Sequence, residues 1–275
     1  MWTRTEFRSD FAPPVIGMVH LPPLPGAPRW GGSLAEVTKA ALADTAALAA
    51  AGVTAIMVEN FHDVPFYRTA VPPETVAAMT AVAAALRAEH PDLRLGINVL
   101  RNDALAALAV AVAVGADYLR VNVHTGTAVT DQGIVEGRAF ETLRRRRELG
   151  AESVGILADV RVKHARPLAD RPLAEEAADL RLRGLADAVI VTGPATGSSA
   201  DPDRLAEVRA ALPDCPVLVG SGVDRTNVAR YLDAADGFIV GSSLQEADPA
   251  TGRRRISASR TGAFLAALSP SLRKG

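Results

Sequence analysis

The sequence predicts a single (β/α)8 barrel, the TIM-barrel fold, over residues 1–275, and three observations support this. The length of 275 residues is close to the ~250 residues typical of the fold. The composition is 48% hydrophobic but only 4% aromatic, as expected of aliphatic helices packed on a buried parallel sheet. Short β-rich runs alternate with alanine- and leucine-rich helical stretches, which predicts parallel strands joined by right-handed crossovers.

The number of strands decides the architecture, because eight βα units close a barrel whereas about five or six favour an open sheet. We expect strands at 15–19, 53–59, 94–99, 116–123, 153–160, 188–192, 217–220 and 237–240. We expect helices near 33–50, 73–90, 102–114, 136–149, 172–183, 202–211, 225–233 and 257–268. No linker or composition break divides the chain, the first strand lacks a GxGxxG motif, and residues 269–275 form a tail that we expect to be frayed.

Charge and cysteine content exclude several classes of partner. The net charge is −1, so nothing indicates binding to nucleic acid or to an anionic membrane surface. Cys215 is the only cysteine, which rules out a disulfide within the chain and favours a reducing compartment. No apolar run is long enough to span a membrane. We therefore expect a cytoplasmic protein, and a homo-oligomer because barrels often self-associate.

Two long loops follow predicted strands and therefore lie at the carboxyl-terminal face, where active sites of this fold are built. One is the proline-rich loop 20–32, and the other is the loop 124–133. Long ordered loops at this face are candidate lids. The alternative is that both are surface covers without a role in chemistry.

Polar side chains gather where nearly all predicted strands end, although buried parallel strands should read as continuous apolar sequence. Period-two alternation places Tyr118, Arg120, Asn122 and His124 on one face of their strand. Asp159, Arg161 and Lys163 share a face of the next strand by the same rule. The candidate mouth residues are His20, Glu59, Asn60, Asn98, Arg120, Asn122, His124, Asp159, Lys163 and Thr192. Each one alone is compatible with a structural pair, but their convergence predicts a polar ligand site.

Glycine-rich turns end the last two strands. Residues 217–223 read VLVGSGV, and residues 238–244 read FIVGSSL. Glycine allows the backbone to approach an anion closely, and exposed N–H groups then bind phosphate oxygens. In many barrels the phosphate site follows strands seven and eight. The predicted phosphate-binding residues are Gly193, Gly220, Ser221, Gly222, Gly241 and Ser242. Loop 192–199 is expected either to complete the cradle or to close over it. The alternative is a pair of tight turns that need glycine for geometry alone.

Several long motifs together resemble the BtpA/SgcQ family. They are IGMVHLPPLPGAP (16–28), VENFHDVPF (58–66), GINVLRNDALAALA (96–109), DYLRVNVHTGTAVTDQGIVEG (117–137), ILADVRVKHA (156–165), VIVTGPATG (189–197), VLVGSGV and GFIVGSSL. The resemblance covers nearly the whole chain and implies a barrel. One branch of the family is linked to photosystem I biogenesis and another to sugar-utilisation genes. The family brings no agreed reaction or catalytic residue to this chain.

The leading hypothesis is an enzyme that acts on a phosphorylated small molecule, a sugar phosphate or a nucleotide-like compound. Asp159 or Glu59 would be the general base, and Lys163 or His124 the general acid or electrostatic stabiliser. Arg120 and Asn122 would fix substrate oxygens, and the other polar mouth residues would line the substrate. Isomerase, aldolase-like lyase and glycosyl-cleaving reactions all fit this set.

Other readings remain open at this stage. Lys163 as a nucleophile would form a Schiff base and would need a depressed pKa. No cofactor is predicted, but His20, Glu59, His124 and Asp159 are ligand-type residues for a divalent metal, although no HxH or HExxH spacing is present. A non-catalytic factor for photosystem I or another complex, and a phosphometabolite sensor without chemistry, are the alternative functions.

Overall fold

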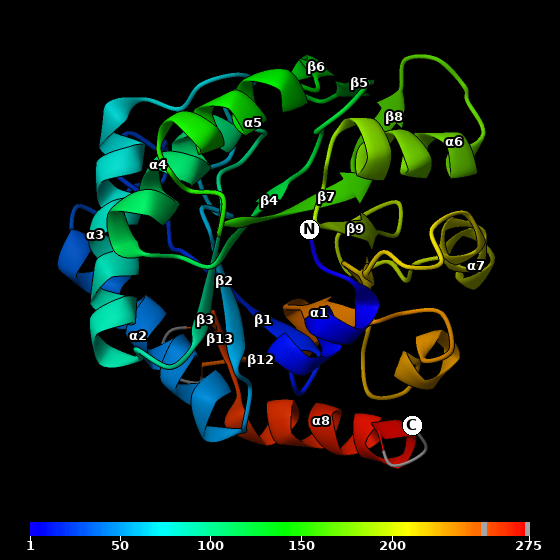
Figure 1. Cartoon of the computed structure of the whole chain (residues 1–275). Coiled ribbons are helices and arrows are strands. Elements are labelled where there is room, and N and C mark those ends of the chain that lie inside the picture. Colours follow the sequence, from blue (N-terminus) through cyan, green and yellow to red (C-terminus); the bar gives the residue numbers. More distant parts are fainter. Residues whose placement is uncertain (249–251, 273–275) are drawn as a thin grey trace.

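The computed structural model describes residues 1–248 and 252–272 and confirms the predicted barrel. Eight parallel strands close in the order β1-β11-β10-β9-β7-β4-β3-β2, with helices around them (Figure 1). The barrel strands are β1 (Val15–His20), β2 (Ala55–Glu59), β3 (Arg94–Asn98), β4 (Tyr118–Val121), β7 (Gly155–Val160), β9 (Ala188–Val191), β10 (Val217–Val219) and β11 (Gly237–Val240). Every expected strand is present, and most differ from the prediction by a residue or two at one end.

The α-helices are α1 (Arg4–Asp10), α2 (Leu34–Ala50), α3 (Pro73–Glu89), α4 (Ala104–Val114), α5 (Ala139–Glu148), α6 (Leu173–Ala178), α7 (Pro202–Ala211) and α8 (Ala258–Leu272). A π-helical turn, η1 (Asp179–Arg183), extends α6. The backbone of α8 is helical through Leu272, so the prediction of a frayed tail was wrong for residues 269–272. Residues 273–275 lie outside the described part of the chain.

The helix expected at 225–233 is wrong, because only a short 3-10 turn, η2 (Val228–Tyr231), forms there. The Asp224 carboxylate accepts hydrogen bonds from the backbone of Thr226 and Asn227, at 2.7 and 3.1 Å. Such a side-chain turn competes with regular helix, and Asn227 and Asp233 are weak helix formers.

Loop 124–133 is not a loop throughout but the start of a small sheet outside the barrel. Strands β5 (Thr127–Thr130) and β6 (Gly133–Glu136) pair antiparallel around a two-residue turn, and β8 (Ala165–Pro167) pairs with the other edge of β5. A second hairpin joins β12 (Gln245–Ala247) to β13 (Arg254–Ile256). The other long loop is packed down, with Leu21 and Leu24 fully buried.

Alternate residues of the barrel strands point inward and build two kinds of layer. The lower interior is apolar and consists of Ile16, Met18, Ala55, Met57, Tyr118, Leu157, Ala188, Ile190, Leu218 and Ile239. Tyr118 fits because Gly96 on the neighbouring strand has no side chain, and a Cβ there would lie 2.0 Å from the ring. The Tyr118 hydroxyl donates to the carbonyl of Ile56 at 2.7 Å. The polar layer therefore begins only above this apolar floor.

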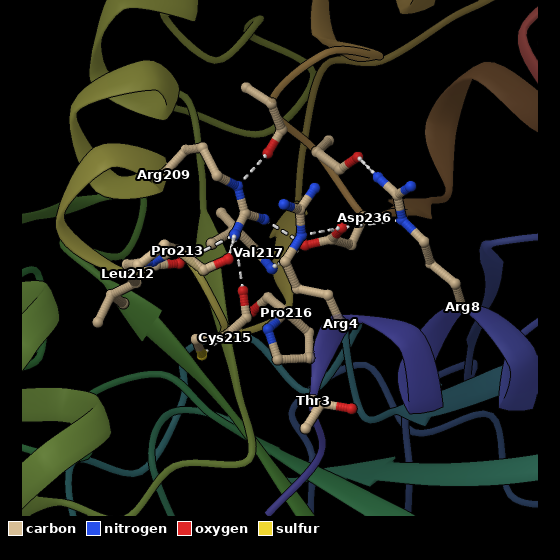
Figure 2. A network of polar contacts seen from close by, with 12 residues as sticks. Thr3, Arg4, Arg8, Arg209, Leu212, Pro213, Cys215, Pro216, Val217 and Asp236 are labelled. Atoms are coloured by element: carbon tan, nitrogen blue, oxygen red, sulfur yellow. Dashed lines mark hydrogen bonds and ion pairs between the residues drawn. The ribbon is translucent and has the colours of Figure 1, made fainter. Parts of the chain in front are cut away.

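Helix α1, which the sequence analysis did not predict, covers the amino-terminal end of the barrel. A capping box between Thr3 and Glu6 starts it, and Phe7 and Phe11 join the apolar interior. Figure 2 shows how Arg4 and Arg8 of α1 reach Asp236, the residue before β11, at 2.9 Å each. Arg209 and the backbone N–H of Val217 bind the other carboxylate oxygen. One fully buried carboxylate thus ties α1 and α7 to two barrel strands.

Replacing this carboxylate should destabilise the fold. Asp236→Asn would leave three guanidinium groups without their counter-charge, two of them on partly exposed side chains. We expect a loss of about 2–4 kcal/mol in the free energy of unfolding, measured by urea denaturation. The matched control is Glu152→Gln, whose ion pair with Arg147 is exposed and should matter by less than about 0.5 kcal/mol. Equal losses in the two variants would refute the anchoring role.

Candidate active site at the barrel mouth

The last inward-facing residues of the eight strands, or the residues just beyond them, form a polar layer at the carboxyl-terminal mouth. They are His20, Glu59, Asn98, Arg120, Asp159, Thr192, Gly220 and Gly241. Their neighbours in register bring them together: His20 lies opposite Glu59, and Glu59 lies opposite Asn98. The alternation rule that predicts this layer holds on every barrel strand.

Arg120 and Asp159 form a buried bidentate ion pair at the centre of this layer. The Arg120 Nε and Nη2 atoms lie 2.9 and 2.8 Å from the two Asp159 oxygens, and the side chains are 2% and 0% exposed. Burial opposes the charge on Arg120, but Asp159 outweighs it and raises the pKa of Arg120. Asn122 donates a further hydrogen bond to Asp159 at 2.9 Å. The carboxylate is therefore engaged in holding Arg120 and is poorly placed to act as a base.

Glu59, the second carboxylate of the mouth, is held less completely. Asn98 donates to one of its oxygens, and Nε2 of His20 lies 3.7 Å from the other. Burial by itself raises the pKa of Glu59, but the neighbouring positive charges and the Asn98 bond more than offset this and lower it. Burial also lowers the pKa of His20 to about 4. At neutral pH Glu59 is thus ionised and His20 is neutral.

Lys163 reaches the same mouth from the loop after β7. Its carbonyl accepts a hydrogen bond from Arg101 at 2.8 Å, and the next residue donates its N–H to Pro194 at 3.1 Å. The prediction that Arg161 shares a strand face with Asp159 and Lys163 was wrong. Arg161 adopts a φ of 56°, so the alternation of the strand ends at this residue. The Arg161 guanidinium instead binds Glu176 of α6 at 2.8 Å.

A cavity of about 720 Å³ joins this polar layer to the glycine turns. The predicted residues that line it are His20, Glu59, Arg120, Lys163, Gly220, Ser221, Gly222, Gly241 and Ser242. The backbone N–H groups of Ser221, Gly222, Val223, Ser242 and Ser243 donate no hydrogen bond within the described residues. Two turns thus bring five free amides to the cavity that also contains Glu59 and Lys163.

Other predicted residues lie behind the cavity or away from it. Asn122 and Asp159 line a smaller cavity of about 290 Å³ below β5 and β8. Thr192 is buried beside Gly220. Asn60 fixes the loop after β3 by accepting from the N–H of Leu100 at 2.7 Å.

Gly193 and His124 do not reach this cavity. The N–H of Gly193 donates to the Ser221 hydroxyl at 2.9 Å, so it serves loop packing. His124 follows the end of β4, where the alternation no longer applies, and its Nε2 lies 2.8 Å from the carbonyl of Gly184 behind the barrel. The prediction that His124 lies at the mouth is therefore wrong.

The four ligand-type residues considered for a metal do not converge. His124 lies behind the barrel, and both oxygens of Asp159 are bound to Arg120. Among the residues that the structure describes, no group of three or more histidine, cysteine or acidic side chains is arranged to hold a metal ion.

Four arginines at or near the cavity were not among the predicted site residues. Arg225, Arg254 and Arg260 line it beside the glycine turns, and Arg254 donates to the carbonyl of Ser242 at 2.9 Å. Arg101 is buried behind Lys163. They come from loops, a hairpin and α8, whose placement beside the mouth no local pattern encodes.

The low pKa of His20 should make stability depend on pH. The unfolded chain protonates this histidine near its ordinary value of 6.5, whereas the folded chain does so only near 4. Between these values the unfolded state binds more protons, so stability falls as the pH decreases from 6.5 to 4. Relative to His20→Gln, the wild type should lose about 3 kcal/mol across this window. Urea unfolding at several pH values measures this, and parallel curves for the two proteins would contradict it.

Comparison with known proteins identifies relatives over nearly the whole chain. The family model described as the BtpA family matches residues 12–267. The photosystem I biogenesis protein BtpA of Synechocystis is 47% identical, over 94% of this chain and 89% of that protein. An uncharacterised protein of Thermococcus kodakarensis is 49% identical, over 84% of this chain and 87% of the relative.

Solved structures with the same fold are more distant. A structure described as native KDPGal has a TM-score of 0.58 and 20% identity, covering 94% of this chain and 96% of that one. Phosphoribosyl anthranilate isomerase from Thermus thermophilus has a TM-score of 0.55 and 13% identity, covering 93% and 98%. These likenesses show the barrel fold alone. The match of the family model and the identity to its relatives show that this chain belongs to the BtpA family.

Proposed function

We propose that this chain is an enzyme acting on a phosphorylated small molecule, a sugar phosphate or a nucleotide-like compound. The observation that carries the proposal is the single cavity shared by two turns with free amides and by Glu59, Arg120 and Lys163. An isomerase, a lyase or a glycosyl-cleaving enzyme would use such an arrangement. One structural neighbour, phosphoribosyl anthranilate isomerase, is by its name an isomerase of a phosphorylated compound.

The phosphate would lie at the turns after β10 and β11. The free N–H groups of these turns offer donors to phosphate oxygens without any loss of existing hydrogen bonds. Arg225, Arg254 and Arg260 add positive charge at this end of the cavity. The opposing carboxylates are those of Asp224, which lines the cavity, and Glu246, which lies 3.7 Å from Arg260. Gly222 is required by shape: its φ is +64°, and a Cβ would lie 2.2 Å from the backbone of Ser198.

The reacting part of the substrate would lie at the other end, among Glu59, Lys163 and Arg120. Glu59 is ionised and has one carboxylate oxygen beside a neutral histidine, so it is the better general base of the two carboxylates. Lys163 would act as general acid or electrostatic stabiliser. Arg120, fixed by Asp159, would bind a substrate oxygen, and Asp159 would act as a positioning residue.

Phosphate binding is tested by thermal stabilisation. Inorganic phosphate and sugar phosphates should raise the Tm by mass action. Arg225→Gln should weaken this shift several-fold without changing the Tm of the free protein, because Arg225 is exposed and lines the cavity. The matched control is Arg147→Gln, because Arg147 is an exposed residue of helix α5. No shift with any phosphate compound would count against the proposal.

A second variant separates an enzyme from a phosphometabolite sensor. Glu59→Gln should retain the phosphate-dependent rise in Tm and should reduce kcat about 10²-fold or more. Wild-type protein that binds phosphate compounds but converts none of them would support the sensor.

A biogenesis factor is the second candidate, because the Synechocystis relative carries that name. One surface feature favours it: Leu105, Ile134 and Phe140 are exposed and line a groove of about 760 Å³ between β6, α4 and α5. Phe140→Glu should then abolish association with a partner complex and leave phosphate binding intact. Within the described residues no helix is long and apolar enough to cross a membrane. We also propose that the protein is cytoplasmic and forms a homo-oligomer.

A further inference from the structure

The distribution of lysine in this chain singles out Lys163. The chain has 30 lysine and arginine residues, but its only lysines are Lys39, Lys163 and Lys274. Lys39 is exposed on α2, and Lys274 lies outside the described residues. Arginine, which stays protonated, thus supplies nearly all positive charge, while a lysine stands at the mouth of the barrel. Lysine differs from arginine in that its amine loses a proton readily when it is buried.

The amine of Lys163 has no polar partner. Within the described residues, Nζ makes no hydrogen bond and no ion pair, and it lies over the face of the Phe61 ring, 6.0 Å from the ring centre, in a cation–π contact. Burial lowers the pKa of Lys163; Glu59 and Asp159 act against this, and Arg120 and Arg101 add to it. Lys163 is half-buried, and a structural lysine at this position would be expected to pair with a carboxylate, because an ammonium that has lost part of its hydration without a partner is costly.

The backbone around Lys163 is fixed from two neighbouring loops. Arg101, from the loop after β3, holds the Lys163 carbonyl, and Pro194, from the loop after β9, holds the following N–H. Arg161, two residues before Lys163, and His164, the residue after it, have positive φ values of 56° and 55°. Non-glycine residues adopt this conformation only where the surrounding structure enforces it. With the backbone held in this way, the side chain of Lys163 lines the cavity of about 720 Å³.

We propose that Lys163 is a nucleophile that forms an imine with the carbonyl carbon of a phosphorylated aldehyde or ketone. This inference rests on the proposed function and narrows it to isomerase or lyase chemistry, excluding glycosyl cleavage. The substrate would place its phosphate at the turns after β10 and β11 and its carbonyl beside Lys163 in the same cavity.

The step balances without any further reagent. The lone pair of neutral Nζ forms the C–N bond. The carbonyl oxygen leaves as water with one proton from Nζ and one from the solvent, and the second Nζ proton stays on the protonated imine. The protonated imine then acidifies the neighbouring C–H bond. Glu59 accepts that proton, the C–H electron pair becomes a C=C bond, and the C=N π pair returns to nitrogen as an enamine. The enamine is reprotonated for isomerisation or reacts as the carbon nucleophile of a lyase running in reverse.

Borohydride trapping with pyridoxal 5′-phosphate, a phosphorylated aldehyde, tests the proposal without knowledge of the natural substrate. Peptide mapping of the full chain should show Lys163 modified, with a mass gain equal to the probe less one oxygen atom. At pH 7 it should be labelled at least about tenfold faster than Lys39, whose amine is exposed. Inorganic phosphate should compete, and pyridoxal without phosphate should label Lys163 more slowly. Glyceraldehyde 3-phosphate and dihydroxyacetone phosphate should then be trapped at the same residue.

Variants and a second measurement keep the outcomes distinct. Lys163→Arg keeps a positive charge but forms no imine, so it should retain the phosphate-dependent rise in Tm and lose all labelling above the level of Lys39. Lys39→Arg is the matched control and should label like wild type. Phosphate-induced stabilisation with Lys163 labelled no faster than Lys39 would overturn the imine and leave the proposed function standing. Absence of stabilisation by any phosphate compound would overturn the proposed function itself.

Discussion

The geometry of the mouth depends on the buried ion pair between Arg120 and Asp159. Two charges at 2% and 0% exposure carry a large desolvation cost, so such a pair is weak evidence for stability. Its effect here is to fix one guanidinium group in the plane of the mouth. Asn122 donates a further hydrogen bond to Asp159. The side-chain oxygen of Asn122, Oδ1, is buried and has no hydrogen-bond partner among the described residues.

The same pair divides the space above the barrel floor into two cavities. Arg120 faces the larger cavity with the glycine turns, whereas Asp159 and Asn122 face the smaller one. Gly220 permits this arrangement because a Cβ there would lie 2.4 Å from Ile190 and 3.7 Å from Nη2 of Arg120. The glycine is therefore needed by packing, whether or not an anion binds at this turn.

The parts of the structure that follow from local pattern could be predicted from the sequence, and the rest depends on long-range contacts. Period-two alternation predicted that Tyr118, Arg120 and Asn122 share a face, and it failed at His124 because β4 ends at Val121. It failed at Arg161 because the backbone there leaves the extended region. The hairpin of β5 and β6 has no polar–apolar alternation, because exposed Val129 and Ile134 stand next to buried Ala128 and Val135, so the pattern did not mark it as two strands.

The cavity lining shows a division between permanent and titratable positive charge. Arginine, which remains protonated under all ordinary conditions, supplies the cations beside the glycine turns: Arg225, Arg254 and Arg260. At the reacting end, Arg120 is neutralised by Asp159, which leaves Lys163 facing Glu59. Because the arginines and free amides would meet the charge of a bound phosphate, Lys163 need not stay protonated to bind the substrate. A lysine freed from the work of binding an anion is available as an amine, and this makes a nucleophile more consistent with the charge pattern than a second anion-binding cation.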